Sequence, residues 1–395
     1  MNVNMRPAAF DSAIPTFARR SLVDYVSTRS FDRPTLIMDI DAVAARYHAL
    51  QRGLGNVAVH YAVKANPAPE VIRRLNVEGC RFDAASRGEI ELCLSLGARP
   101  RDISFGNTIK RSADIAFAHR AGLKLFAADS DGELVKISQN APGAQVYIRL
   151  LIEESQADWP LSRKFGTSGD EAIRLMGVAR DLGLKPVGIS FHVGSQTRDP
   201  LMWGKPLAFA AGVWHAARKA GFALDLLNIG GGFPAFYGEE MTDPETYAAR
   251  VMAQVHALFG PVKRIMAEPG RGLVAEAGLI VAEVMLVSKK RPDDEVRWVY
   301  LDIGKFSGLA ETMDEAIRYQ FETAWDGTTT GPCILAGPSC DSADVLYEKR
   351  PVELPLALNS GDRVLIMACG AYTSSYSSVG FNGFPPLDVI CLENH

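Results

Sequence analysis

Short apolar runs alternate with longer amphipathic segments between residues 57 and 270. Each run is rich in Val, Ile, Leu or Phe, and segments with helical spacing such as "RGEIELCLSLG" separate the runs. The eight runs are "VAVHYAVK", "RFDAAS", "DISFGN", "LKLFAAD", "AQVYIRLL", "PVGISFHVG", "LDLLNIGGG" and "RIMAEPG". Strand followed by helix, repeated in this way, predicts a parallel sheet, and the count favours a closed (β/α)8 barrel. An open, doubly wound sheet is the alternative.

The pattern changes after residue 278, where helical periodicity is weak. Runs such as "GLIVAEVMLVSKK" and "GDRVLIMACGAY" are separated by Pro, Gly and Asp clusters, which predicts a second, β-rich domain resembling a sandwich or barrel. The early run "PTLIMDI" at 34–40 precedes the first barrel helix, so we expect it to pair with that later sheet. The chain is therefore predicted to be α/β, with a barrel at 41–277 and a β-rich domain from 1–40 and 278–395.

Composition and charge exclude several classes of function. The 395 residues carry 42 Lys+Arg against 46 Asp+Glu and no long basic run, so no nucleic-acid partner is expected. The six cysteines show neither CxxC pairs nor metal-ligand spacing, and we expect neither a disulfide nor a metal site. The start has no signal-peptide layout, and the apolar stretch "AGLIVAEVMLV" contains Glu283 and is too short to span a bilayer. We therefore expect a cytoplasmic protein without a membrane partner.

Polar and charged groups stand at the ends of the predicted barrel strands. They are Lys64, Asp83, Arg149, His192, the glycines at 230–232 and Glu268. In a (β/α)8 barrel the functional groups gather at the carboxyl ends of the strands. A lone lysine there is usually a solvated charge, but acidic, imidazole and basic groups on one rim predict a functional site.

Two glycine-rich loops predict an anion-binding cup on the same rim. "NIGGGFP" removes three successive side chains where a strand turns into a loop, which lets backbone N–H groups approach an anion. "EPGRG" adds a second glycine-flanked bend and the guanidinium of Arg271. A simple tight turn is the alternative for the glycine triplet.

Seven motifs in sequence order carry a resemblance to a known family. They are "YAVKANP", "FDAAS", "SFHVGSQ", "NIGGGFP", "EPGRG", "GPSCDSADVL" and "GAYT…FNGF". From about residue 35 to the C-terminus the chain resembles the barrel-type (fold type III) pyridoxal-phosphate-dependent amino-acid decarboxylases, and within them the ornithine/lysine decarboxylases. The resemblance implies pyridoxal 5'-phosphate as cofactor and an enzyme that converts L-ornithine to putrescine in polyamine biosynthesis. Conversion of L-lysine to cadaverine is implied as a second reaction.

The resemblance assigns roles at the cofactor. Lys64 would form the Schiff base, and an apolar strand end suits it because desolvation lowers the pKa of a lysine. Glu268 would pair with the pyridine nitrogen, and His192 would stack on the ring face. Asp83 and Arg149 would lie nearby and order hydrogen bonds, with a structural ion pair as the alternative. The set implied to hold the phosphate is Ser195, Gly232, Gly270, Arg271 and Tyr372.

At the substrate end, "PSCDS" and "ETMDE" carry the implied roles. Cys340 would return a proton to the α-carbon, while Asp341 and Asp314 would bind the distal ammonium of a diamino acid. An exposed helical acid is the alternative for Asp314. This chain has Met313 where the eukaryotic members carry a tyrosine. Its loop between Tyr372 and "FNGF" is also one residue longer than theirs. Both departures bear on the length of substrate side chain that the pocket prefers. The loop at 157–166 keeps only the family's "KFG" end.

The resembled family forms head-to-tail homodimers with shared active sites, which we expect here. Diaminopimelate decarboxylase is the first rival, but it typically carries Glu after the cysteine and Ser after "EPGR", where this chain has Asp341 and Gly272. Racemases of similar fold put arginine on the pyridine nitrogen, and non-catalytic homologues lose either the second domain or the cofactor residues. The sequence does not decide between ornithine and lysine as the substrate. The two differ by one methylene, which is worth only roughly 1–3 kcal/mol of discrimination.

Overall fold

The protein is represented by a computed structural model that describes residues 16–152 and 164–393. The chain divides into two compact units, each of which is described by itself. One unit consists of Ala44–Pro234 and Met241–Leu273. The other combines the described residues up to Val43 with Ala235–Glu240 and the described chain from Val274 onward.

The first unit contains eight parallel strands that close into a barrel, which confirms the predicted (β/α)8 architecture. The strands are β2 (Ala58–Ala62), β3 (Arg81–Ala84), β4 (Ile103–Phe105), β5 (Leu125–Ala128), β6 (Gln145–Arg149), β7 (Lys185–Ser190), β8 (Leu226–Asn228) and β9 (Arg264–Ala267). Closure occurs where Ala58 of β2 pairs with Met266 of β9. Each predicted apolar run coincides with one of these strands to within two residues at its start, and the closure excludes the alternative of an open sheet.

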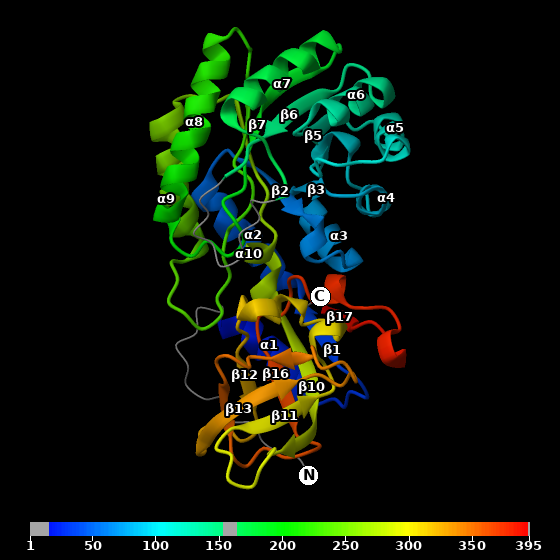
Figure 1. The fold of residues 1–395 in the computed structure, drawn as a ribbon, viewed down its shortest axis with the longest axis vertical. Coiled ribbons are helices and arrows are strands. Elements are labelled where there is room, and N and C mark those ends of the chain that lie inside the picture. The colour runs from blue at the N-terminus through cyan, green and yellow to red at the C-terminus, as the bar shows by residue number, and fades with distance from the viewer. Residues whose placement is uncertain (1–15, 153–163, 394–395) are drawn as a thin grey trace. The chain divides into compact units, whose positions relative to one another are not determined.

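Helices lie around the outside of the barrel (Figure 1). They are α3 (Pro69–Val77), α4 (Arg87–Ser95), α5 (Ser112–Arg120), α6 (Asp131–Asn140), α7 (Gly169–Asp181), α8 (Gly204–Lys219) and α9 (Pro244–Phe259), preceded by α2 (Ile40–Leu54). Local sequence sets their starts: the Ser86 hydroxyl accepts the Glu89 N–H at 3.3 Å before α4, and Asp243 accepts the Thr246 N–H at 2.9 Å before α9. These caps satisfy backbone donors that a helix leaves unpaired at its first turn.

Apolar side chains fill the barrel interior. Ala127, Tyr147, Leu226 and Met266 come from β5, β6, β8 and β9 and form one buried cluster. The interior is therefore a packed core, as is usual for this architecture. Strands β7 and β8 approach closely at Gly188, where a Cβ atom would lie 1.8 Å from the carbonyl oxygen of Leu226. Only glycine allows this approach.

The second unit is built on a mixed sheet of nine strands among the described residues. The strands are β1 (Thr35–Asp39), β10 (Gly278–Ser288), β11 (Arg297–Leu301), β12 (Phe321–Thr323), β13 (Thr330–Ala336), β14 (Val345–Leu346), β15 (Val352–Pro355), β16 (Arg363–Ile366) and β17 (Asp388–Leu392). Thr35 of β1 pairs with Val281 of β10 and with Asp388 of β17. The predicted β-rich domain and its pairing with residues 34–40 are both confirmed.

The core of this unit joins segments that are far apart in the sequence. Helix α1 (Thr16–Ser27) contributes Leu22 and Val26, which pack with Ile37 of β1, Leu279 of β10 and Leu365 of β16. Burial of these aliphatic side chains is worth roughly 1.5–3 kcal/mol each, so the N-terminal segment is held by the hydrophobic effect.

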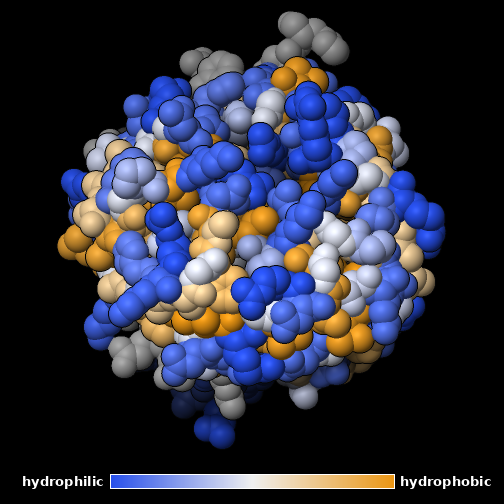
Figure 2. Space-filling view, turned by 90° about the horizontal axis from the view of Figure 1, so that it is seen from above, coloured by the Kyte–Doolittle hydropathy of each residue, from blue (hydrophilic) through white to orange (hydrophobic). Residues whose placement is uncertain are grey.

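Hydrophilic residues dominate the face shown in Figure 2, where the apolar residues stand in small separate groups. None of the helices in the described part of the chain is long and apolar enough to cross a bilayer.

Replacement of Gly188 by alanine tests the close approach of β7 and β8. Because the new methyl group would collide with backbone rather than with a mobile side chain, we expect Gly188→Ala to lower the free energy of unfolding by about 3 kcal/mol or more. Gly177→Ala in α7 is the control, since a Cβ atom there meets nothing within 4 Å. It should leave stability unchanged or raise it by roughly 0.5–1 kcal/mol. Urea unfolding followed by circular dichroism measures both, and equal effects would contradict the close approach.

Candidate active site

Lys64 lies immediately after strand β2, in the short 3-10 helix η1 (Val63–Ala65). Its neighbours Val63 and Ala65 are buried, as the apolar run predicted, but the Lys64 side chain is exposed. Lys64 thus stands at the end of an apolar strand, as the sequence indicated, and falls beyond the last paired position of that strand, Ala62.

Asp83 points into the same rim from β3 and is only 5% exposed. Burial raises its pKa, while the charge of Lys64, a hydrogen bond from Ser104 and the charge of Arg149 lower it. The Ser104 hydroxyl donates to Oδ1 at 3.2 Å. Gly106 makes room for the carboxylate, because a Cβ atom there would lie 1.9 Å from Oδ1. The charges of Lys64 and Arg149 thus act on Asp83 at the same rim.

His192 follows β7 and is half-buried. The Gly194 N–H donates to its Nδ1 at 2.9 Å, so the neutral ring carries its hydrogen on Nε2. Burial, followed by the charges of Arg149 and Lys64, lowers the pKa of His192 well below its usual value. The imidazole is therefore uncharged near neutral pH and presents an aromatic face rather than a second cation.

The glycine triplet after β8 is shaped by close contacts. Gly230 and Gly232 have φ values of +71° and +113°, in the region that favours glycine. A Cβ atom on Gly232 would lie 2.5 Å from Cγ2 of Val193 and 2.7 Å from the Gly194 carbonyl oxygen. The loop after β7 therefore packs directly against the backbone of Gly232, which leaves no room for a side chain at that position.

Arg271 supplies the positive charge beside these loops. It is 3% exposed and begins the short helix α10 (Arg271–Val274) directly after Gly270. Its Nε and Nη2 groups donate to the Ser195 hydroxyl at 3.2 and 3.1 Å. A guanidinium, a hydroxyl and a glycine loop in one place form an arrangement that suits an anionic group.

Glu268 follows β9 and is held by Asn228, the last residue of β8. The Asn228 Nδ2 donates to Oε1 of Glu268 at 2.5 Å, and the Gly230 N–H donates to the Asn228 Oδ1 at 2.9 Å. Asn228 is fully buried. The sequence did not predict this role, because the glycine triplet that follows is the more conspicuous feature. A polar residue closing an otherwise apolar strand was the available signal.

The carboxyl of Glu268 has a pKa raised to about 7. Burial is the largest cause and the charge of Asp83 the next, while the Asn228 hydrogen bond and the charges of Lys64 and Arg149 lower it. The nearby Tyr147 is buried, and burial together with Glu268 and Asp83 raises the pKa of its hydroxyl well above 10.0. A positive group placed beside Glu268 would favour the ionised carboxylate.

The other predicted residues lie in the β-rich unit. Tyr372 has a positive φ of 56° and is half-buried, with its ring 5.7 Å from that of Tyr376. Cys340 and Asp341 are exposed, and the Cys340 N–H donates to Oδ1 of Asn382 at 3.1 Å. Their position relative to Lys64 stays a prediction.

Asp314 is also exposed, but it does not lie in a regular helix. Its φ is 53°, and its carboxylate lies 3.9 Å from the Lys349 Nζ, with 94% of the side chain exposed. Most of the loop at 157–166 lies outside the described residues. No cluster of His, Cys, Asp or Glu in the described ranges is arranged to hold a metal ion.

Comparisons with known proteins identify the class. Residues 40–275 match the family described as pyridoxal-dependent decarboxylase, pyridoxal binding domain. The lysine/ornithine decarboxylase of Selenomonas ruminantium is 33% identical over 362 residues, covering 91% of this chain and 90% of that protein. The crystal structure of lysine/ornithine decarboxylase from Vibrio vulnificus, complexed with cadaverine, matches with a TM-score of 0.84 and 33% identity over 95% of this chain and 99% of that one. The chain therefore belongs to the pyridoxal-dependent decarboxylases.

A structural neighbour of lower sequence identity is named for another basic amino acid, arginine. The arginine decarboxylase of Paramecium bursaria Chlorella virus matches with a TM-score of 0.85 at 26% identity, covering 94% of this chain and all of that one (100%).

The barrel fits pyridoxal phosphate, the cofactor of this family. The Arg271 guanidinium and the Ser195 hydroxyl, beside the glycine turn at 230–232, supply the positive charge and the donors that a phosphate group requires. Glu268 supplies a carboxylate that a protonated ring nitrogen would neutralise, and neutral His192 supplies a flat face.

The raised pKa of Glu268 predicts a pH-dependent stability of the cofactor-free protein. A carboxyl with a higher pKa when folded binds more protons in the folded state, so stability falls as pH rises from about 4.5 through 7. Glu268→Gln removes the free-energy cost of ionising the buried carboxyl. It should therefore stabilise the cofactor-free protein at pH 8 by on the order of 1–3 kcal/mol, with little effect at pH 5.

Urea unfolding at several pH values measures that difference. Glu171→Gln is the control: Glu171 is exposed, and its hydrogen bond to Arg174 lowers its pKa, so it titrates below this window. The difference between the native protein and Glu171→Gln should be flat from pH 5 to 8. A flat difference for Glu268→Gln as well would contradict the raised pKa.

Proposed function

We propose that this decarboxylase converts L-ornithine to putrescine, with L-lysine to cadaverine as a second reaction. The observation that supports this proposal is the arrangement of side chains at the carboxyl ends of the barrel strands. Lys64, neutral His192 and Glu268 lie on this rim, where Asn228 holds the Glu268 carboxylate. The Arg271–Ser195 pair lies on the same rim. The names of its relatives support a basic amino acid as substrate, since the proteins of Selenomonas and Vibrio are both called lysine/ornithine decarboxylases. A second Vibrio structure is described as complexed with putrescine.

Each barrel residue has a distinct role in this proposal. Lys64 holds the cofactor through its amine. Arg271 and Ser195, with the glycines at 230–232 and Gly270, bind its phosphate, and Tyr372 completes this set. Pyridoxal phosphate, when bound, supplies a ring that takes up the electron pair left by departing CO2.

Glu268 keeps a proton on the ring nitrogen, which strengthens that electron sink. The Asn228 amide stabilises the ionised form of Glu268, because a hydrogen bond to a carboxylate favours its charge. His192 would stack on the ring face, where its neutral state would avoid repulsion with a protonated ring. Asp83 and Arg149 order the polar groups beside Lys64.

The substrate end requires a proton donor and a site for the distal ammonium. In the reaction the bond from the α-carbon to the carboxylate breaks, CO2 leaves, and a proton takes its place on the α-carbon. We assign that proton to Cys340, and the binding of the distal ammonium to Asp341 and Asp314. Charge-assisted hydrogen bonds of this kind are worth roughly 1.5–3 kcal/mol each. The exposed positions of all three residues leave them accessible to a second molecule.

We further propose a homodimer in which Cys340 and Asp341 reach the cofactor of the partner subunit. An isologous two-fold interface forms two identical composite sites at once. Support comes from their exposure and from their location in a different compact unit from Lys64. The six cysteines are free, which accords with a cytoplasmic location, where thiols are kept reduced.

A substrate panel tests the proposed reaction. L-ornithine, L-lysine, L-arginine and meso-diaminopimelate are compared by kcat/KM for CO2 release. We expect ornithine to exceed lysine by about tenfold or more, as one methylene allows, with the other two near background. Lys64→Ala should abolish turnover, and borohydride reduction of the native holoenzyme should label Lys64. Preference for arginine or diaminopimelate would refute the substrate, and labelling of Lys110 or Lys305 would refute the attachment site.

Subunit complementation tests the shared site. Inactive Lys64→Ala and inactive Cys340→Ala subunits are mixed and allowed to exchange. Half the dimers should be mixed, each with one intact site and one doubly altered site, so activity should recover to about a quarter of the native value.

The control mixes Lys64→Ala with Glu268→Ala. Both residues lie in the same barrel unit, so exchange cannot restore a complete site from them. If the Cys340 mixture also stays inactive despite demonstrated exchange, each chain completes its own site.

A further inference from the structure

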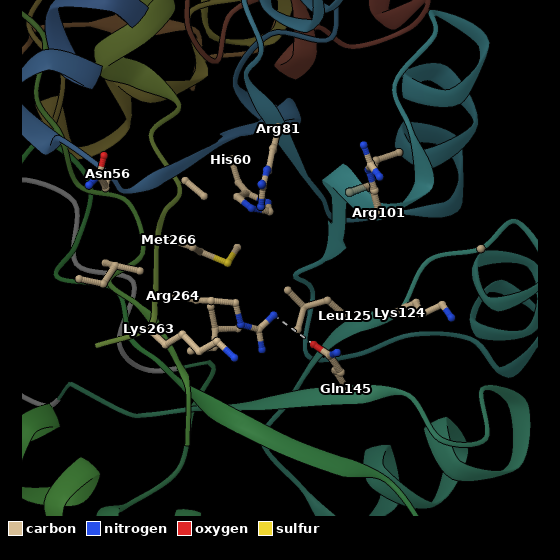
Figure 3. Close-up of a pocket in the computed structure, with 15 residues that line it drawn as sticks. Asn56, His60, Arg81, Arg101, Lys124, Leu125, Gln145, Lys263, Arg264 and Met266 are labelled. Carbon is tan, nitrogen blue, oxygen red and sulfur yellow. Dashed lines mark hydrogen bonds between the residues drawn. The ribbon is translucent and has the colours of Figure 1, made fainter. Parts of the chain in front are cut away.

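A basic hollow lies at the amino-terminal end of the barrel strands, the end opposite to Lys64. Its volume is about 440 Å³, within the range of roughly 300–1,000 Å³ typical of small-molecule sites. Its lining includes the first residue of seven barrel strands: Ala58, Arg81, Ile103, Leu125, Gln145, Leu226 and Arg264. The hollow is thus the amino-terminal mouth of the barrel (Figure 3).

Positive charge is concentrated around this mouth. Arg81, Arg101, Lys124, Lys263 and Arg264 are among its 15 lining residues, none of which is acidic. His60 in its wall is buried and adds no charge, because burial and Arg81 lower the pKa of His60 to about 3. The whole chain has a formal net charge of -4, so this excess of cations is local.

Two of the arginines are held in place from outside the hollow. Arg264 donates through Nη2 to Asp225 at 2.5 Å and through Nη1 to Gln145 at 3.2 Å. Arg81 pairs with Asp102 through Nε at 3.5 Å. Figure 3 shows Arg81 and Arg264 extending toward the centre of the view, with Met266 between them. Neither carboxylate lines the hollow, so the ion pairs orient the guanidinium groups without filling it.

The other three cations have no such structural explanation. Arg101, Lys124 and Lys263 are exposed and form no ion pair with any described residue. Ion pairs at the amino-terminal face of a barrel stabilise the fold, which accounts for Arg81 and Arg264. Like charges left around one hollow repel each other, and a bound anion would remove that repulsion.

The floor of the hollow is apolar. Leu125, Leu226 and Met266 line it. Leu226 and Met266 belong to the packed cluster of the barrel interior, and Leu125 packs against that cluster. A phosphate alone would not use this floor, whereas an organic phosphate would place its body there and its charge on the rim.

We propose that this mouth binds a small phosphate-bearing molecule, with the phosphate against Arg81, Arg264 and Lys263. A guanidinium presents parallel N–H groups that match two phosphate oxygens, and several cations suit a group of more than one negative charge. The phosphate can come from a nucleotide or from an inorganic polyphosphate. This site is separate from the proposed decarboxylation and does not depend on it.

Titration calorimetry on the holoenzyme tests the site. Saturation with pyridoxal phosphate keeps the cradle at Arg271 filled, and about 0.15 M salt screens exposed charges beyond roughly 8 Å. We expect one saturable site per chain for ADP and for pyrophosphate. Tighter binding of ADP than of pyrophosphate would indicate that the site takes a nucleotide, with its body on the apolar floor. Equal binding of the two would indicate that the site takes an inorganic polyphosphate. Binding of citrate as tight as that of pyrophosphate would overturn the assignment to phosphate.

Charge-removing variants locate the binding. Arg101→Gln, Lys124→Gln and Lys263→Gln combined should weaken both ligands by about tenfold or more. The matched control combines Arg73→Gln, Arg218→Gln and Lys219→Gln, which removes the same formal charge from exposed barrel helices. It should change the affinity less than about twofold.

Absence of saturable binding, or equal losses in the two triple variants, would overturn the site. Lys263→Gln alone provides the same comparison against Lys219→Gln if the first triple variant fails to fold. Ornithine decarboxylation should persist in every variant, since none of these residues lies at the carboxyl ends of the strands.

Discussion

The ends of β8 and β9 are joined by one polar junction on which the geometry of the site depends. Asn228 donates to Glu268 and accepts the Gly230 N–H, so a single buried amide fixes the carboxylate and the start of the glycine turn together. A buried amide left unpaired would cost roughly 1–3 kcal/mol, which makes any other arrangement of these two strand ends unfavourable. The turn it fixes then meets Val193 and Gly194, and through them sets the position of His192.

The same rim concentrates opposite charges in a small volume. The charge of Asp83 raises the pKa of Glu268, and the charges of Lys64 and Arg149 lower the pKa values of both carboxyl groups. Two carboxylates at short range in a partly dry site are stable only when cations or hydrogen bonds offset them. A cofactor with a cationic ring nitrogen and an anionic phosphate matches this distribution at both ends. The electrostatics of the barrel rim are therefore arranged for a dipolar ligand before it binds.

Periodicity and motif order predicted the fold because each barrel strand is a short apolar run with its functional residue at the end. Lys64, Asp83, Arg149, His192 and Glu268 could be named in this way. Asn228 and Gly106 could not, because their roles depend on contacts between strands that spacing does not encode. The sequence predicted that the second unit is rich in β-strands. Its mixed strand order was not predicted, because that order depends on pairings between strands that are distant in sequence.

The two ends of the barrel differ in how their charged side chains are compensated. At the carboxyl end, acids and bases face one another, and most of their charge is compensated within the rim. At the amino end, Asp102 and Asp225 bind their arginines from behind, and the remaining cations face an open hollow. The apolar cluster of Ala127, Tyr147, Leu226 and Met266 fills the barrel interior and carries no charge of its own. One barrel therefore presents a rim of mutually compensating acids and bases at its carboxyl end and an excess of cations at its amino end.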